Sequence, residues 1–291
     1  MADYHPPYCS VQFLGSIINN PLLWEQYGRD EYYSERASFV KNIIPDDVNS
    51  LLDVGAGKGE IINNLTENID TVMGLDISEE ALKYLNCKAV LGSIENLPFD
   101  DKSFDLVMCM EVLEHLPIKS LSLGVHELQR VAKNYLLISV PFNENIDARK
   151  VRCPRCKMIF NIDTHFRNFQ TERELCQLFP DFQLNKKWLC GPSYRRPSRV
   201  QLFIQQKILN IYYPLDHYFV CIFCGAKYSE FESITSNERT SFAKNRFGLL
   251  RSLSRLRIFE MLFKLFSFLK KNEACWMFVL LRRNEIIKIN H

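Results

Sequence analysis

The chain has 291 residues, of which 47% are hydrophobic and 24% are charged. This length and composition suit one large folded domain, or a domain with insertions, and exclude a wholly disordered chain. The formal net charge is only +2, so the charge balance does not indicate nucleic-acid binding, and we expect no nucleic-acid partner.

Residues 1–10 lack a basic region followed by an apolar segment, and the chain contains no run of about eighteen uncharged apolar residues. We therefore expect a cytoplasmic protein. Ten cysteines are spread over the chain, and two pairs of them have Cys-x-x-Cys spacing. In a long chain of this kind, such pairs favour metal binding over a disulfide framework.

Apolar runs that alternate with helical patterns indicate the fold. We expect helices at residues 36–44, 59–67, 78–86, 121–132 and 171–178, and strands at residues 51–54, 71–75, 89–91, 104–110, 135–140, 182–189 and 274–281. Strands that are apolar throughout and separated by helices are typical of a parallel sheet covered on both faces. The expected fold class is therefore a doubly wound α/β sheet.

Residues 50–60 combine an apolar run with three alternating glycines, Ser-Leu-Leu-Asp-Val-Gly-Ala-Gly-Lys-Gly-Glu. Glycine adopts positive φ and has no side chain, so Gly55, Gly57 and Gly59 allow a sharp turn on which a nucleotide-like ligand can lie. The pattern predicts a strand, this turn and a helix whose free N–H groups face the ligand. A glycine-rich turn without a ligand is the alternative.

Carboxylates flank the glycine turn on both sides. In an open parallel sheet the ligand lies beyond the carboxyl ends of the strands. Asp76 ends the second expected strand, where a carboxylate can accept both hydroxyls of a ribose. A nicotinamide dinucleotide site would also have this acid, but its glycines are spaced G-x-G-x-x-G, unlike those of residues 55–59. Asp53 is a poor neighbour for a pyrophosphate and suits a cationic ligand.

Four motifs follow one another between residues 50 and 141. They are Leu-Leu-Asp-Val-Gly-Ala-Gly-Lys-Gly at 51–59, Gly-Leu-Asp-Ile-Ser at 74–78, Asn-Leu-Pro-Phe-Asp-Asp-Lys-Ser-Phe-Asp-Leu-Val at 96–107, and Glu-Val-Leu-Glu-His-Leu at 111–116. With these motifs the chain resembles the class I S-adenosylmethionine-dependent methyltransferases, and closely the type 11 branch. The resemblance implies a Rossmann-like sheet of seven strands whose last strand is antiparallel, with 274–281 as its candidate.

The resemblance also implies which residues bind the cofactor. Asp53, Gly55 and Gly57 would line its methionine part, within the turn that Gly59 completes. Asp76 would hold the ribose, and Glu111 would lie beside the cofactor. Ile77 would pack on the adenine, and Ser93 and Ile94 would edge the adenine pocket. Many relatives have an aspartate at the position of Ser93 to accept from the adenine amino group. The serine departs from that pattern.

Two histidines are the candidate catalytic residues. His165 precedes the expected helix at residue 171, where relatives often have a histidine that faces the substrate. A hydroxyl acceptor needs a base as its proton leaves. His115 follows Glu111 and Glu114 on one turn. A structural role is the alternative for each histidine, and a zinc-ligand role is a further one for His165.

The two cysteine pairs, Cys153 with Cys156 and Cys221 with Cys224, are candidate metal ligands. Each pair can place two thiolates on one ion from a tight turn, and two such turns make a closed tetrahedral site typical of structural zinc. Their separation is long against the usual spacing of about 15 to 20 residues. Free buried cysteines are one alternative, and a site that uses Cys190 or His165 in place of one thiolate is another.

Residues 245–271 are basic and rich in leucine and phenylalanine at roughly helical intervals. Such a helix could lie on an anionic membrane surface, which would make the protein peripheral at the membrane. The alternative is a lid or docking helix whose apolar face covers an insertion.

These patterns divide the chain into six segments. Residues 1–45 are an N-terminal lead-in and cap, 46–142 the cofactor-binding core, 143–170 an insertion with the first cysteine pair, 171–189 a core helix and strand, 190–272 an insertion with the second cysteine pair and the basic helix, and 273–291 the last core strand and tail.

The sequence predicts a methyltransferase that uses S-adenosylmethionine to methylate an oxygen of a saccharide or another small acceptor, lipid-linked forms included. A structural zinc would shape the acceptor site. One alternative keeps this chemistry with a quinone-like lipid, nitrogen or protein acceptor. Another alternative, from a different class, is a zinc-ribbon binding module on a degenerate methyltransferase fold.

Overall fold

The computed structural model describes residues 31–67, 69–191, 202–208, 210, 212–213, 215, 221, 223–231 and 275–284. The predicted basic helix at 245–271 and most of the lead-in segment lie outside these residues. The chain forms two compact units. The described parts of 31–144, 165–191 and 275–284 make up the first unit, and those of 145–164 and 202–231 make up the second.

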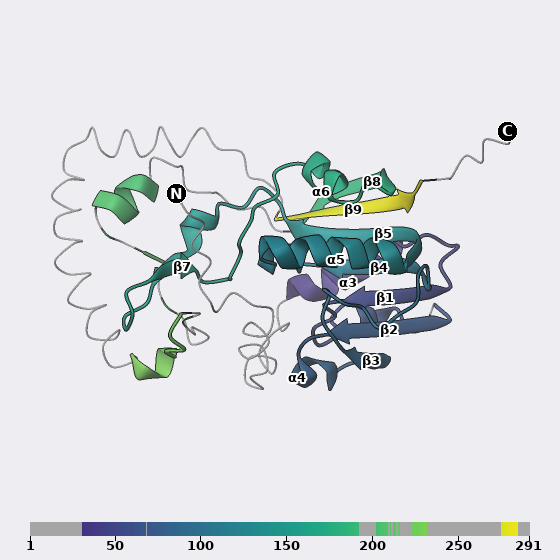
Figure 1. Cartoon of the computed structure of the whole chain (residues 1–291), viewed down its shortest axis with the longest axis horizontal. Coiled ribbons are helices and arrows are strands. Elements are labelled where there is room, and N and C mark those ends of the chain that lie inside the picture. Colours follow the sequence, from purple (N-terminus) through teal and green to yellow (C-terminus); the bar gives the residue numbers. More distant parts are fainter. Residues whose placement is uncertain are drawn as a thin grey trace. The chain divides into compact units, whose positions relative to one another are not determined.

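The first unit is built on a seven-stranded sheet with the order β3-β2-β1-β4-β5-β9-β8 (Figure 1). Its strands are β1 (Ser50–Val54), β2 (Thr71–Asp76), β3 (Lys88–Leu91), β4 (Phe104–Met110), β5 (Ala132–Pro141), β8 (Phe182–Cys190) and β9 (Trp276–Arg283). The first five strands pair in parallel, whereas β9 is antiparallel to both β5 and β8. The predicted sheet and its antiparallel last strand are confirmed.

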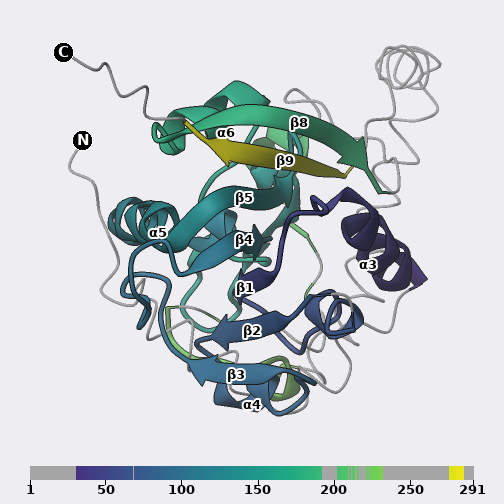
Figure 2. The ribbon, with the colours of Figure 1, turned by 90° about the vertical axis from the view of Figure 1, so that its right-hand side faces the viewer.

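Helices cover both faces of the sheet because successive side chains of a strand point to opposite sides. Leu52, Val107 and Leu136 belong to one buried cluster, together with apolar residues of α5 (Ile118–Val131). Their neighbours Leu51, Leu106 and Leu137 belong to a second cluster with Val40 of α3 (Glu31–Ile43). Figure 2 shows α5 and α3 on opposite faces of the sheet. Every residue of β4 is buried, as the apolar run predicts.

The helix predicted at 59–67 is wrong, because this stretch contains only the 3₁₀ turn η1 (Ile62–Asn64). The Asn63 side chain donates to the carbonyl of Tyr84 at 3.0 Å and accepts from the N–H of Asn86 at 2.8 Å. Asparagine side chains that bond to backbone groups compete with helix formation. These bonds tie η1 to the loop before β3.

The other predicted helices are present, with one shortened. The helix predicted at 78–86 is only α4 (Glu79–Leu82), although its predicted N-cap is confirmed, since the Ser78 hydroxyl accepts from the N–H of Ala81. The last helix of this unit is α6 (Glu172–Leu178), and Thr171 caps it. Among the described residues, no helix is both long and apolar enough to cross a membrane.

The second unit contains a small hairpin that the sequence analysis did not predict. Its strands β6 (Lys150–Arg152) and β7 (Ile159–Asn161) are antiparallel. Short helical turns accompany them, namely η3 (Ile146–Arg149), η4 (Ile204–Ile208) and η5 (Tyr228–Glu230). Arg149 pairs with Asp163 and donates to the Tyr213 hydroxyl at 2.8 Å. The hydrogen bond between Arg149 and Tyr213 joins the two sequence segments of the unit.

An ion pair on α5 holds the loop that precedes β4. Arg130 donates to the carbonyls of Leu97 and Phe99 in this loop and to the carboxylate of Glu127. The Glu127 carboxylate also accepts from the N–H of Leu97, at 2.8 Å. The hydrogen bond from Arg130 lowers the pKa of Glu127 to about 2. The ionised form of Glu127 is therefore the one that stabilises this loop.

We expect Glu127→Gln to lower the free energy of unfolding at pH 7 by about 1 kcal/mol, which is a few degrees in melting temperature. Because the pKa of Glu127 is depressed in the folded state, its contribution exists above about pH 4.5 and disappears as the pH falls toward 2. Melting curves of the wild type and the variant should converge at low pH. The matched control is Glu35→Gln, at an exposed residue of α3. A difference in melting temperature between the wild type and Glu127→Gln that stays constant with pH would contradict this interpretation.

Candidate functional site

The glycine turn leaves the carboxyl end of β1 with positive φ at each glycine, 81° at Gly55, 55° at Gly57 and 84° at Gly59. The N–H groups of Gly55 and Ala56 both donate to the carbonyl of Leu75, at 2.8 and 3.1 Å. A Cβ atom at residue 55 would lie 2.3 Å from the Cγ2 atom of Val112. The sharp predicted turn therefore requires glycine on grounds of both conformation and space.

Asp76 lies at the end of β2 and is almost fully buried. Its carboxylate accepts from the N–H groups of Gly57 and Ser78, each at 2.8 Å. These bonds fix the carboxylate next to the glycine turn. Burial raises the pKa of Asp76, and the backbone bonds oppose that effect. The structure thus brings the glycine turn and Asp76, both predicted to bind the cofactor, together.

Asp53 is the unbalanced charge of the site. It is only 5% exposed, and its Oδ1 atom has no hydrogen-bond partner among the described residues. Burial, with a smaller effect of the Asp76 carboxylate, raises the pKa of Asp53 to about 7, although the charge of Arg36 opposes this shift. A buried carboxylate without a partner is costly. A cationic ligand group beside the turn would supply the missing partner, so these residues fit S-adenosylmethionine.

Glu111 follows β4 with an unusual backbone φ of 55°. Its carboxylate accepts from the Ser139 hydroxyl at 2.9 Å and lies 3.6 Å from the Arg36 guanidinium. Arg36 also donates to Ser139 and lies over the ring of Trp276, 5.0 Å from its centroid. Burial raises the pKa of Glu111, and Arg36 opposes the shift. Arg36 is therefore the guanidinium that offsets the carboxylates at the ends of β1 and β4.

The residues predicted to contact the adenine lie at the ends of β2 and β3. Ile77 is half-buried directly after Asp76. Ser93 accepts from the N–H of Glu95 at 3.2 Å, so its hydroxyl is engaged within its own turn. Ile94 is buried in the core, and it packs so closely on α5 that a Cβ at residue 124 would lie 3.0 Å from it. Of these residues, Ile77 and Ser93 keep partly exposed surface.

The two predicted catalytic histidines lie together. The rings of His115 and His165 make an edge-to-face contact with centroids 4.7 Å apart. His165 Nδ1 lies 2.5 Å from a carboxylate oxygen of Glu144, and both side chains are about nine-tenths buried. Glu114 adjoins the histidines, and burial raises its pKa well above the usual range. The structure thus pairs His165 with Glu144 and places both histidines near Glu114.

Two of these residues were missing from the sequence-based prediction. Arg36 lies on a helix whose amphipathic pattern is weak, so nothing in its surroundings in the sequence indicates a charged contact in the site. Glu144 follows the end of β5 by three residues. The rule that ligands lie beyond the carboxyl ends of parallel strands could have pointed to Glu144.

All four paired cysteines meet in the second unit, as predicted. Sγ atoms of Cys153 and Cys224 are 3.7 Å apart, and those of Cys156 and Cys221 are 3.6 Å apart. Four thiolates around one zinc at about 2.3 Å would be about 3.8 Å from one another. The alternatives with Cys190 or His165 as a ligand do not fit, because the cluster consists of the two pairs. The donor set suits structural zinc.

The two cysteine turns have the same backbone geometry. The N–H of Lys157 donates to the carbonyl of Cys153 at 3.0 Å, and the N–H of Gly225 donates to that of Cys221 at 2.8 Å. Lys157 and Gly225 both have positive φ, 63° and 69°. Such repeated turns direct two thiols toward one point, although the pairs are far apart in sequence.

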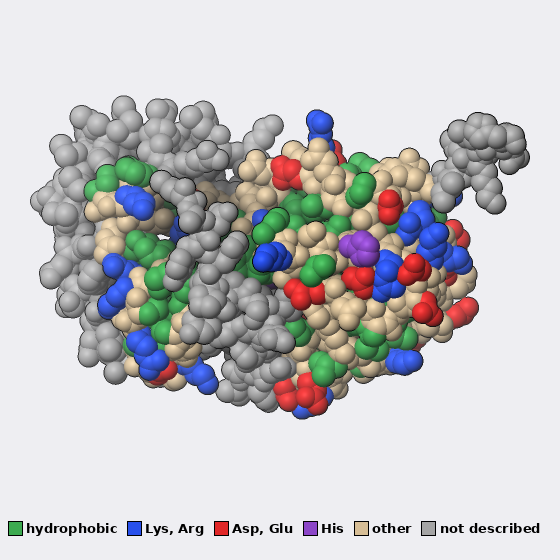
Figure 3. All heavy atoms as spheres, viewed as in Figure 1, with side chains coloured by type: hydrophobic (Ala, Val, Ile, Leu, Met, Phe, Trp, Pro, Cys, Tyr) green, Lys and Arg blue, Asp and Glu red, His purple; other side chains and the backbone are tan. Residues whose placement is uncertain are grey.

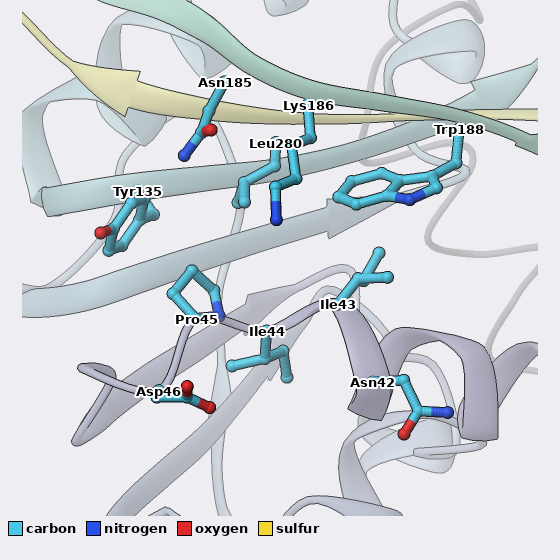
Figure 4. Close-up of a pocket in the computed structure, with 10 residues that line it drawn as sticks. All are labelled: Asn42, Ile43, Ile44, Pro45, Asp46, Tyr135, Asn185, Lys186, Trp188 and Leu280. Carbon is cyan, nitrogen blue, oxygen red and sulfur yellow. The ribbon is translucent and has the colours of Figure 1, made fainter.

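A cavity of about 420 Å³ lies at the other end of the parallel strands (Figure 4). It is lined by Asn42, Ile43, Ile44, Pro45, Asp46, Tyr135, Asn185, Lys186, Trp188 and Leu280. Pro45 and Asp46 precede β1, and Tyr135 is near the start of β5, so this cavity is remote from the glycine turn. On the face of the sheet-containing unit seen in Figure 3, basic and acidic side chains are interspersed, in keeping with the small net charge.

The strand order, the glycine turn with Asp53, and Asp76 at the end of β2 together define a class I S-adenosylmethionine-dependent methyltransferase domain. Residues 52–136 match the family model described as a methyltransferase domain. This part of the chain is therefore a class I S-adenosylmethionine-dependent methyltransferase domain. A solved structure of a SAM-dependent methyltransferase from Archaeoglobus fulgidus has this fold, with a TM-score of 0.51 and 16% identity over 90% of this chain and 99% of that one.

Two curated relatives match part of the chain. The 27-O-demethylrifamycin SV methyltransferase of Amycolatopsis mediterranei is 32% identical over 120 residues, which are 35% of this chain and 44% of that protein. A ubiquinone biosynthesis O-methyltransferase of Coxiella burnetii is 27% identical over 144 residues, which are 44% of this chain and 58% of that protein. The chain spans about half the length of these relatives.

We expect Asp53→Asn to stabilise the free protein at pH 8. The pKa of Asp53 rises from 3.8 to about 7 on folding, so its burial removes stability as the pH rises through this range. The cost at pH 8 is about 4 kcal/mol. The melting temperature of the variant should exceed that of the wild type at pH 8 and equal it near pH 4. An equal difference at both pH values would contradict the assigned burial of charge.

Protein purified under reducing conditions without chelator should contain about one zinc per chain, measured by mass spectrometry of the metal. Cys224→Ser should lower this content and the thermal stability, because three thiolates hold the ion less tightly. The control is Cys176→Ser on α6, outside the cluster. Wild-type protein without metal would rule out the zinc site.

Proposed function

We propose that the protein transfers a methyl group from S-adenosylmethionine to an oxygen of a saccharide or another small acceptor. The observation that carries this proposal is the buried carboxylate of Asp53, whose Oδ1 atom has no hydrogen-bond partner among the described residues, beside a glycine turn that Asp76 holds in place. A family match supports the donor, and the O-methyltransferase names of two relatives support oxygen as the acceptor atom.

The chain's own residues account for binding of the donor. Asp53 would pair with its cationic part, the turn from Gly55 to Gly59 would lie against it, and Asp76 would accept from the ribose hydroxyls. Ile77 would pack on the adenine, edged by Ser93 and Ile94. When bound, S-adenosylmethionine supplies a methyl group that the positive charge on sulfur already activates. Alignment of the acceptor and exclusion of water would then give much of the rate.

The acceptor side would involve His115 and His165, whereas Glu111 would lie beside the cofactor. An acceptor hydroxyl loses its proton as its oxygen is methylated, and this loss needs assistance at neutral pH. His165 is held by Glu144 and faces His115, beyond the ends of β4 and β5. We assign to these histidines the assistance of proton loss.

The second unit would select the acceptor, with a structural zinc ordering its two cysteine turns. The chain leaves the sheet for this unit after β5 and again after β8, and it returns before β9. Strand β8 runs in the same direction as β5, since both are antiparallel to β9. Both points at which the chain leaves the sheet are therefore at the edge of the sheet that carries the glycine turn.

A quinone-like lipid is the second candidate acceptor, favoured by the ubiquinone-related name of one relative. A zinc-ribbon module on a degenerate methyltransferase fold would not need the cofactor residues. The buried Asp53, the three glycines with positive φ and the bonded Asp76 are all in place, and this favours an enzyme over such a module.

The test is calorimetric titration with S-adenosylhomocysteine at pH 7.5. We expect micromolar binding by the wild type and at least a tenfold loss of affinity in Asp76→Ala, because the ribose hydroxyls lose their acceptor. Asp70→Ala, on the loop before β2, is the control and should bind as the wild type does. An absence of binding in the wild type would contradict the proposed function and favour the module.

A further inference from the structure

Four polar side chains, buried or partly buried, lie beyond the ends of β4 and β5 and form what we call the histidine–glutamate cluster: Glu114, His115, Glu144 and His165. Glu114 and His115 belong to the 3₁₀ turn η2 (Leu113–His115). The N–H of Phe166 donates to the carbonyl of Glu114 at 2.8 Å, and the N–H of Asn143 donates to that of Phe169 at 2.7 Å. These backbone bonds fix the segment around His165 between the two strand ends.

Glu114 is the member that a purely structural role does not explain. It is 1% exposed, yet neither of its carboxylate oxygens has a hydrogen-bond partner among the described residues. Glu114, His115 and His165 each offer one possible metal-ligand atom, a carboxylate oxygen or a ring nitrogen, and these three atoms lie within 4.8 Å of one another. A buried carboxylate beside two imidazoles needs a positive partner, since an unpaired buried charge is costly.

Glu144 holds the imidazole of His165 in a fixed orientation. Its carboxylate oxygen lies 2.5 Å from Nδ1 of His165, and the two side chains are 10% and 11% exposed. A histidine that binds a metal commonly donates its other ring N–H to a carboxylate, which fixes the tautomer and leaves the opposite nitrogen free for the ion. The Glu144–His165 contact has this form.

We propose that Glu114, His115 and His165 bind a divalent first-row transition metal ion, with Glu144 orienting His165. Two imidazole nitrogens and one carboxylate form a donor set that suits such ions and leaves coordination positions open. This site differs from the cysteine cluster, whose four thiolates close the coordination of a structural ion.

The ion would act on the acceptor side, and this part of the inference rests on the proposed function. A cation in an open site lowers the pKa of a hydroxyl that approaches it, so the two histidines would assist proton loss through the ion that they hold. The hydroxyl O–H bond breaks and its proton passes to solvent. The oxygen forms a bond to the methyl carbon, and the bond from that carbon to sulfur breaks with its electron pair left on sulfur. A methyl ether, S-adenosylhomocysteine and one proton result.

Equilibrium dialysis of the full chain against Mn²⁺ tests the site, with all first-row metals then counted per chain by mass spectrometry. We expect the wild type to hold about one ion more than Glu114→Gln. This variant keeps the side-chain shape and replaces a buried carboxyl group with a neutral amide, so it should fold about as stably. His165→Ala should lose the same ion. Zinc held by the cysteines is counted equally in the wild type and the variants, so it does not affect the difference between their metal counts.

His126→Ala is the matched control, because the His126 side chain is 75% exposed on α5 and should not affect the count. Equal metal counts in the wild type, Glu114→Gln and His165→Ala would overturn the proposal. Binding of S-adenosylhomocysteine by the same proteins tests the proposed function separately, since that ligand lies on the Asp53 and Asp76 side. A protein that binds the ion but not this ligand would refute the function and retain the site.

Discussion

The buried carboxylate of Asp53 is the constraint on which the site depends. It lies at the end of the central strand β1, where the glycine turn begins, and one of its oxygens has no partner among the described residues. Arg36 offsets part of this charge from α3, and Glu111 and Ser139 hold Arg36 in place. The free protein therefore has an excess of buried negative charge at this edge of the sheet. A cationic ligand would relieve that excess, which couples the fold to the donor that the family uses.

The remaining buried polar groups follow the same logic with different partners. Asp76 is satisfied by backbone N–H groups, so it is a fixed acceptor. The carboxylate oxygens of Glu114 have no hydrogen-bond partner in the part of the chain that the structure describes, and the two adjacent imidazoles make Glu114 a candidate metal ligand. In the second unit, two turns with the same backbone bonds direct four thiols to one point. Each unit thus places its chemical groups through turns that local sequence dictates, and the sheet or the hairpin supplies the frame.

Much of this could be predicted from the sequence, for identifiable reasons. Apolar runs such as 104–110 give buried strands, and alternating glycines give a turn with positive φ. The Cys-x-x-Cys turns are local, so their meeting was predictable once metal binding was assumed. The helix at 59–67 was wrong because Asn63 bonds to distant backbone groups. Arg36 and Glu144 were missed because their roles arise from tertiary contacts, which periodicity and spacing do not encode.

The central claim is that Asp53 is the counter-ion of a cationic donor. Isothermal titration calorimetry of S-adenosylmethionine binding near pH 6, in buffers of different ionisation enthalpy, measures the protons released. Because burial raises the pKa of Asp53 to about 7, the wild type should release about one proton per chain on binding. Asp53→Asn should bind more weakly and release almost none. Equal proton release by the two proteins, or none by the wild type, would contradict the account.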